Sequence, residues 1–168
     1  MRSLKTLLTA IVLLGALSFT NAQSKVAHIN VQQLLSEMPE MKAAQAELKK
    51  LEETYKADLQ SSFQEFQSKA KLYESEAASK TQAENEKRAV ELQNFERNLG
   101  EARQTASQEL QKKQGELYQP ILQKANDAVQ KVAKAQGFHY VLDASPGSGV
   151  ILAEGKSLLA DVKKELGF

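Results

Sequence analysis

The side chains in this sequence that could carry out catalysis are few. There is no cysteine, and the only two histidines are His28 and His139. Each histidine lies in a short apolar segment typical of a β-strand, so a sheet could bring the two together. A metal or proton-transfer site would also need further ligands, and no cysteine or cluster of carboxylates accompanies the two histidines. A hydrogen-bonded structural pair is therefore the favoured interpretation, and we predict no enzyme activity, metal or cofactor.

Two other patterns are equally weak as signs of chemistry. The adjacent carboxylates Glu52 and Glu53 lie in a long run of helix-forming, mostly charged residues, where acidic side chains usually face solvent. The stretch "SPGSG" at 145–149 is shorter than a phosphate-binding loop and lacks the Lys-Ser/Thr that follows one. We therefore look for function in the elements that make up the chain.

The first 22 residues have the features of a secretory signal peptide. Arg2 and Lys5 give a positive start, residues 7–17 form an apolar run, and Thr20 and Ala22 are small residues before the expected cleavage point. The apolar run is too short to span a bilayer, and no later stretch is long enough either. We expect an exported chain whose signal peptide is cleaved and which has no stable membrane insertion.

Charge excludes one class of partner. The full chain has 22 basic and 21 acidic residues, and removing Arg2 and Lys5 leaves 20 against 21. Both signs are interspersed, and nothing resembles the basic face that nucleic-acid binding requires. Nucleic-acid binding is therefore not expected.

Residues 39–117 are expected to form a helical arm, as the first part of a helical region that runs to about residue 136. Pro39 suits the first turn of a helix, and apolar residues then recur about once per turn. One narrow apolar stripe can be buried against a partner helix but cannot form a globular core. A turn near 78–81 would let the chain pack against itself, and "TQAE" at 81–84 has the capping-box pattern that begins a helix. A continuous helical rod is the alternative.

The two halves of the predicted hairpin match in a specific register. With the fold near Ser79, Phe66 meets Leu92, Phe63 meets Phe95, and Leu59 meets Leu99. Slips of seven residues keep some of these pairs, and only the capping box favours the chosen register. The stripe fades toward the turn, which predicts that the tip opens more easily than the base. The predicted seam comprises Leu48, Leu51, Tyr55, Leu59, Phe63, Phe66, Leu92, Phe95, Leu99 and Leu110.

Residues 23–38 and 118–168 are expected to form a small body. A strand near 26–31 leads into a short helix capped by Asn30, with Gln33 as its capping-box partner. After Gly137, "FHYVLDA" and "VILAE" suggest two strands joined as a hairpin by "SPGSG", and Ser157 is expected to cap a last helix. The fold class is therefore α+β: a long antiparallel helical hairpin, or coiled-coil arm, on a small β body.

So small a body with open strand edges points to assembly of several chains. The residues that we expect at subunit contacts are Val26, Ile29, Val141, Leu142, Val150 and Ile151.

The order of these segments resembles the Skp/OmpH family of periplasmic chaperones. The most specific stretches are "YQPILQKANDAVQKVAKAQGFHYVLDAS" at 118–145 and the residues from 26 to 41. The resemblance implies a jellyfish-like homotrimer whose three arms enclose unfolded outer-membrane proteins without ATP. Family members are often strongly basic, whereas this chain is nearly neutral, which speaks against charge-driven binding of lipid or lipopolysaccharide.

Two functions remain open from the sequence. The first is a holdase chaperone for unfolded outer-membrane proteins, which should have loose arms and no specific docking patch. The second is a structural coiled-coil spacer or adaptor of the cell envelope with one folded partner. Internal packing is the first interpretation for the arm aromatics, and Leu72 and Tyr73 near the tip are the better candidates for client contact.

Overall fold

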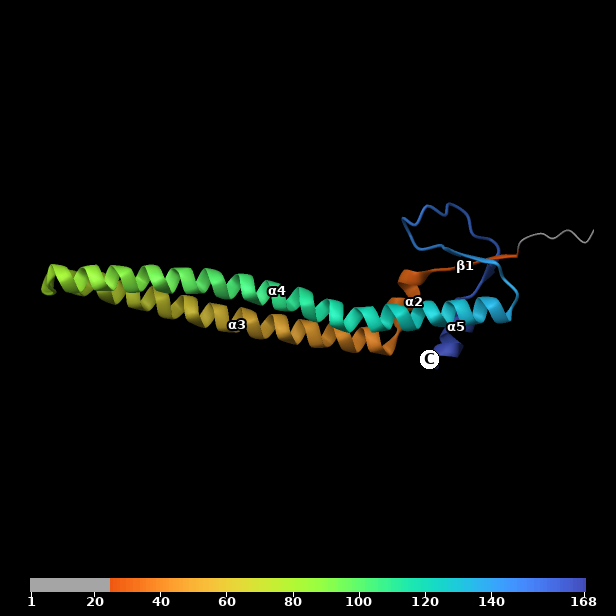
Figure 1. Ribbon diagram of the computed structural model, residues 1–168, viewed down its shortest axis with the longest axis horizontal. Coiled ribbons are helices and arrows are strands. Elements are labelled where there is room, and N and C mark those ends of the chain that lie inside the picture. The colour runs from red at the N-terminus through yellow and green to blue at the C-terminus, as the bar shows by residue number, and fades with distance from the viewer. Residues whose placement is uncertain (1–24) are drawn as a thin grey trace, which may run out of the picture.

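The computed structural model describes residues 25–168 as a long helical hairpin that projects from a small body (Figure 1). The expected signal peptide at 1–22 lies outside the described residues. The body contains β1 (Val26–Ile29), α2 (Val31–Glu37), β2 (Tyr140–Asp143), β3 (Lys156–Ser157) and α5 (Leu159–Leu166). The arm is formed by α3 (Pro39–Glu76), the 3₁₀ turn η1 (Ala77–Ser79) and most of α4 (Gln82–Ala135).

Local sequence signals place the ends of the arm helices. Pro39 begins α3, as expected for a residue that has no N–H to leave unpaired in the first turn. Thr81 caps α4, its side chain accepts a hydrogen bond from Glu84 N, and the Glu84 carboxylate accepts one from Thr81 N. This is the predicted capping box, and it marks where the chain reverses. The alternative of a continuous rod is therefore wrong.

The far part of α4 supplies one side of the core of the body. The helix continues through Pro120, and Ile121, Ala125, Ala128 and Val132 are buried beyond it. They belong to one cluster with residues of α2, β1, α5 and the residue before α5, of which Leu34, Leu158 and Val162 are fully buried. The helix ends as predicted at Gly137, whose φ of 72° is the left-handed conformation that glycine adopts without strain.

The sheet differs from the prediction. All three strands are short, and their order is β2-β1-β3, with both β2 and β3 parallel to β1. The predicted strand at "VILAE" is absent, and β3 lies just after it, so no hairpin forms across "SPGSG". Because β1 occupies the centre of the sheet, β2 and β3 each pair with it and cannot pair with one another. Residues 144–155 therefore form a long loop that extends away from α4 (Figure 1).

The predicted caps of the two short helices are partly wrong. Asn30 caps α2 by accepting a hydrogen bond from Gln33 N at 2.8 Å, but the Gln33 side chain binds Glu37 in place of completing the capping box. Leu158, not Ser157, is the N-cap of α5, because Ser157 is still paired with β1.

Candidate functional site: the arm and the exposed face of the sheet

The seam of the arm is only partly closed. Leu99 and Ala106 are buried, and the rings of Phe66 and Phe95 pack with their centroids 5.8 Å apart. Leu48, Leu51, Tyr55, Leu59, Leu92 and Leu110, all predicted for the seam, are half-buried. Phe63 is 40% exposed, so its predicted place in the seam is wrong. The residue one position earlier, Ser62, is half-buried instead.

The register of the hairpin is shifted from the prediction. Lys69 pairs with Glu91, where the predicted register places Ala89 opposite it, and Phe66 contacts Phe95 where Leu92 was expected. A helical side chain leans toward the N-terminus of its helix, so the residue that covers a given spot lies about one position C-terminal to it. In an antiparallel pair both helices contribute this displacement in the same direction, which is the direction of the observed shifts of two residues at Lys69 and three at Phe66.

The two candidates for client contact lie in different environments. Leu72 is 51% exposed, whereas Tyr73 is half-buried and its hydroxyl donates a hydrogen bond to Glu91 at 2.6 Å. Because Tyr73 is already engaged within the hairpin, only Leu72 remains a candidate. The exposed apolar residues Phe63 and Val90 lie elsewhere on the arm and were not predicted as contacts.

The outer face of the sheet is apolar and exposed. Val26 lies opposite Tyr140 and His28 lies opposite Leu142, so these four residues share one face. Val26, Tyr140 and Leu142 are each roughly half exposed, at 45%, 60% and 46%. The other face carries Ala27 and Ile29, which are buried in the core. Strand alternation would have identified Tyr140, which the prediction missed, because it stands two residues before Leu142.

The other residues expected at subunit contacts are divided between the core and the surface. Ile29 is 1% exposed and Val141 packs against the core cluster, so both serve their own chain. Val150 is half-buried. Ile151 is fully exposed, at 101%, and its neighbour Leu152 is 73% exposed. The loop thus presents two large apolar side chains to solvent.

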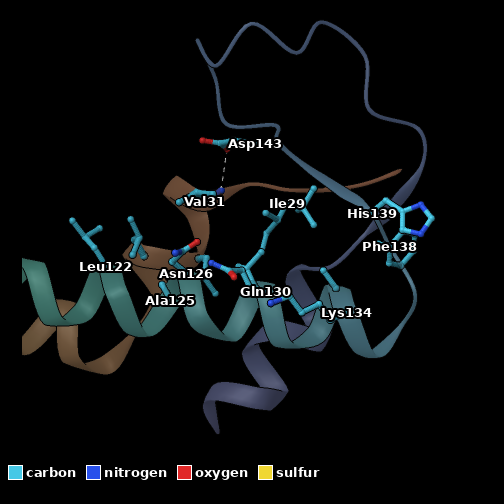
Figure 2. A pocket seen from close by; sticks show the side chains of 15 residues that line it. Ile29, Val31, Leu122, Ala125, Asn126, Gln130, Lys134, Phe138, His139 and Asp143 are labelled. Carbon is cyan, nitrogen blue, oxygen red and sulfur yellow. Dashed lines mark hydrogen bonds between the residues drawn. The ribbon is translucent and has the colours of Figure 1, made fainter. Parts of the chain in front are cut away.

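A groove of about 460 Å³ lies between α4 and the elements β1, α2 and β2 (Figure 2). Its apolar walls include Ile29, Leu34, Ala125, Val129 and Phe138. In Figure 2 the α4 residues Leu122, Ala125 and Asn126 line one side, while Val31 and Asp143 lie across from them. The groove is thus bounded on one side by the residues that end β2.

A polar network holds that end of β2 against the start of α2. The Asp143 carboxylate accepts hydrogen bonds from Ser145 Oγ at 2.6 Å, Ser145 N at 2.9 Å and Val31 N at 3.3 Å. Partial burial raises the pKa of Asp143, but these hydrogen bonds outweigh burial and hold the pKa below its ordinary value. Ser145 Oγ also accepts a hydrogen bond from Gln32 N, so the network fixes where the exposed loop begins.

The two histidines do not form a pair. His28 lies opposite Leu142 and Ser157 in the sheet, and His139 precedes β2 at the rim of the groove. No hydrogen bond joins their side chains, so the predicted structural pair is wrong. Within residues 25–168, no three side chains of His, Asp or Glu gather as a metal site would require. In the same range, none of the helices combines the length and apolar content needed to cross a membrane.

Comparison with known proteins shows which sequences this chain is similar to. Residues 25–166 match the family described as outer membrane protein (OmpH-like). The chaperone protein Skp of Pectobacterium atrosepticum is 24% identical, over 92% of this chain and 93% of its own. The chaperone protein Skp of Photorhabdus luminescens is 27% identical, over 97% of this chain and 99% of its own.

A solved structure has the same fold. A protein described as an OmpH-like outer membrane chaperone, from Caulobacter crescentus CB15, superposes with a TM-score of 0.77 at 21% identity. The match covers 86% of this chain and 85% of that one, and it shows that the fold is shared. With the family match spanning nearly all of the described residues, the chain belongs to the family of OmpH-like outer membrane proteins.

Proposed function

We propose that this protein is a periplasmic chaperone that holds unfolded outer-membrane proteins without ATP and keeps them from aggregating. The observation that carries the proposal is the arm: a 38-residue helix, about 57 Å long, packed against a second helix along one narrow seam. The two relatives named chaperone protein Skp also support it, because they align with this chain over nearly their whole length. The expected signal peptide supports a periplasmic location.

The arm suits a client that has no fixed shape. An unfolded strand of an outer-membrane barrel alternates apolar and polar side chains and aggregates when left alone. The arm offers scattered apolar side chains such as Phe63, Leu72 and Val90 within a charged surface, and no deep pocket is needed. Such contacts are individually weak, so a client can leave without an energy source. Several arms acting together would still hold it firmly.

We further propose that three copies assemble through their sheets, with the arms pointing the same way. In this assembly a second copy of the chain covers the exposed face of the sheet. Val26, Tyr140 and Leu142 form an apolar face, and β2 and β3 each have a free edge that can accept another strand. The loop supplies Ile151 and Leu152, whose apolar side chains are largely exposed in the single chain. A second chain that takes up this segment would bury both surfaces.

The test is suppression of aggregation by the mature chain. A purified outer-membrane protein unfolded in urea is diluted into buffer with and without the chain, and light scattering is recorded. We expect scattering to fall to near zero at one trimer per client, with or without ATP. Scattering that stays unchanged at a severalfold excess of trimer would refute the chaperone function. In that case a structural spacer with one folded partner would be the remaining alternative.

A variant of the arm tests where the client is held. Leu72→Asp places a charge on an exposed apolar position of the arm and should weaken suppression severalfold without affecting assembly. Leu122→Asp is a matched control, because Leu122 is similarly exposed but lies on the body side of α4. Equal loss in both variants would argue against client contact at Leu72.

A further inference from the structure

The tip of the arm is joined by polar side chains from both helices. Lys69, Tyr73 and Glu76 of α3 contact Arg88 and Glu91 of α4, and we call these five residues the tip clasp. The Tyr73 hydroxyl donates a hydrogen bond to Glu91 at 2.6 Å, and Lys69 makes an ion pair with the same carboxylate. Arg88 pairs with Glu76 at 2.6 Å. The clasp lies where the apolar stripe fades.

Tyr73 connects the two halves of the clasp. The Arg88 guanidinium lies 4.5 Å from the centre of the Tyr73 ring, a cation–π distance, while the hydroxyl of the same ring reaches Glu91. The Arg88 side chain is only 19% exposed, and its Nη2 pairs with Glu76 while its Nη1 is buried without a hydrogen-bond partner. Hydrogen bonds to Lys69 and Tyr73 lower the pKa of Glu91, which keeps that carboxylate charged and able to accept both. Linked polar contacts of this kind stabilise one another.

Beyond the clasp, the turn itself is also closed. The Asn85 side chain donates a hydrogen bond to Ala77 O at 2.9 Å, across the turn. The capping box pairs the backbone N–H groups of Thr81 and Glu84 at the start of α4. Contacts between the two helices of the arm therefore continue from Lys69 to the turn.

The middle of the arm contains a residue with poor helix propensity. Gly100 lies inside α4, and a Cβ added there would have no heavy atom within 4 Å. Close packing therefore does not require glycine at this position. A glycine inside a helix lowers its stability by about 1 kcal/mol relative to alanine. In the stretch that follows, Ala106 faces the seam and brings little apolar bulk to it, whereas Ala102, Thr105 and Ser107 are exposed.

We propose that the tip clasp holds the end of the arm closed as a stiff unit and that the arm bends around Gly100. This replaces the expectation that the tip opens more easily than the base. Such an arm would change its reach by bending near its middle, with its two helices still paired at the end. The inference concerns the arm alone and does not depend on the chaperone function.

Hydrogen exchange of the mature, assembled chain tests the clasp. In the unmodified protein, the helical amides on either side of the turn, at 70–76 and 86–92, should exchange several times more slowly than those at 98–107. Tyr73→Phe and Glu91→Gln should each raise exchange at 70–76 and 86–92 about three- to tenfold, and the double variant should be little worse than either single one. Glu86→Gln is the matched control, because the hydrogen bond that Glu86 accepts comes from Gln82 of its own helix and does not cross the hairpin.

A tip that exchanges faster than the middle of the arm would overturn the proposal. The proposal would also be overturned if Tyr73→Phe and Glu91→Gln raised amide exchange no more than Glu86→Gln does. The same holds if the increase in exchange in the double variant equalled the product of the two single increases. These results are independent of any client, so they are distinguishable from failure of the proposed function.

The bending point is tested in the same measurement. Gly100→Ala should slow exchange at 98–107 about three- to fivefold, because it removes the glycine without a clash. Gly115→Ala is the matched control, since it also has open space around it but lies nearer the body. No slowing by Gly100→Ala, or equal slowing of 98–107 by Gly115→Ala, would refute bending at Gly100.

Discussion

Replacing Ile151 by aspartate should dissociate the proposed trimer without unfolding the chain. Ile151 is fully exposed in the single chain, so the substitution removes no contact on which the fold depends. Burying an isoleucine side chain at an interface contributes about 2 kcal/mol, and a trimer contains three copies, so about 6 kcal/mol is lost. This lowers the association constant by about four orders of magnitude, before the added cost of bringing a carboxylate into an apolar contact.

Sedimentation velocity over a range of concentrations measures this change directly. The unmodified mature chain should sediment as a trimer at micromolar concentration, and Ile151→Asp should sediment as a monomer with unchanged helical circular dichroism. Val90→Asp is the control, because Val90 is also well exposed but lies on the arm, and it should remain trimeric. An Ile151→Asp protein that stays trimeric to nanomolar concentration, or an unmodified chain that is monomeric, would refute assembly through the loop.

The other predictions concern stability. Leu34→Ala should lower the free energy of unfolding by about 2–5 kcal/mol in urea titration, because Leu34 is fully buried in the body; a loss below 1 kcal/mol would mean that the core is not closed there. Thr81→Ala should lower local stability by about 1 kcal/mol, seen as faster amide exchange in the first turn of α4, whereas Glu84→Asp should have a smaller effect; equal exchange in all forms would contradict the capping box. Asp143 has a lowered pKa in the folded chain, so its contribution is fully present above its ordinary pKa, near 3.8, and is lost as the pH falls through the lower folded value. Stability measured from pH 5 to pH 2 should therefore fall less steeply in Asp143→Asn than in the unmodified chain, and equal slopes would contradict the hydrogen bonds from Ser145.

Local signals in the sequence were enough to place most of the helix boundaries. Pro39, the Thr81–Glu84 capping box and Gly137 each act through backbone groups within a few residues, so their effect is independent of the rest of the fold. The same is true of Asn30, which caps α2 through its own side chain. The apolar period of the arm, combined with the capping box, was likewise enough to indicate that the chain folds back on itself.

Features that depend on contacts between distant segments were not predictable in detail. "VILAE" has strand-forming residues, but β1 takes the central place in the sheet, so the segment is left in an exposed loop. Phe63 and Ser62 are neighbours in sequence, and only the rotation of α3 against α4 decides which of them faces the seam.

By itself, the sequence determined where helices begin and end and that one apolar stripe must find a partner, because these depend on backbone chemistry and on the period of the helix. Only the tertiary structure decided the order of the strands, the register of the arm and the joining of Tyr73, Arg88 and Glu91 at its tip. Those features depend on which side chains meet when segments far apart in the chain are packed together. Several pairings bury nearly equal apolar surface, so a single strand or helix carries no local signal that selects among them.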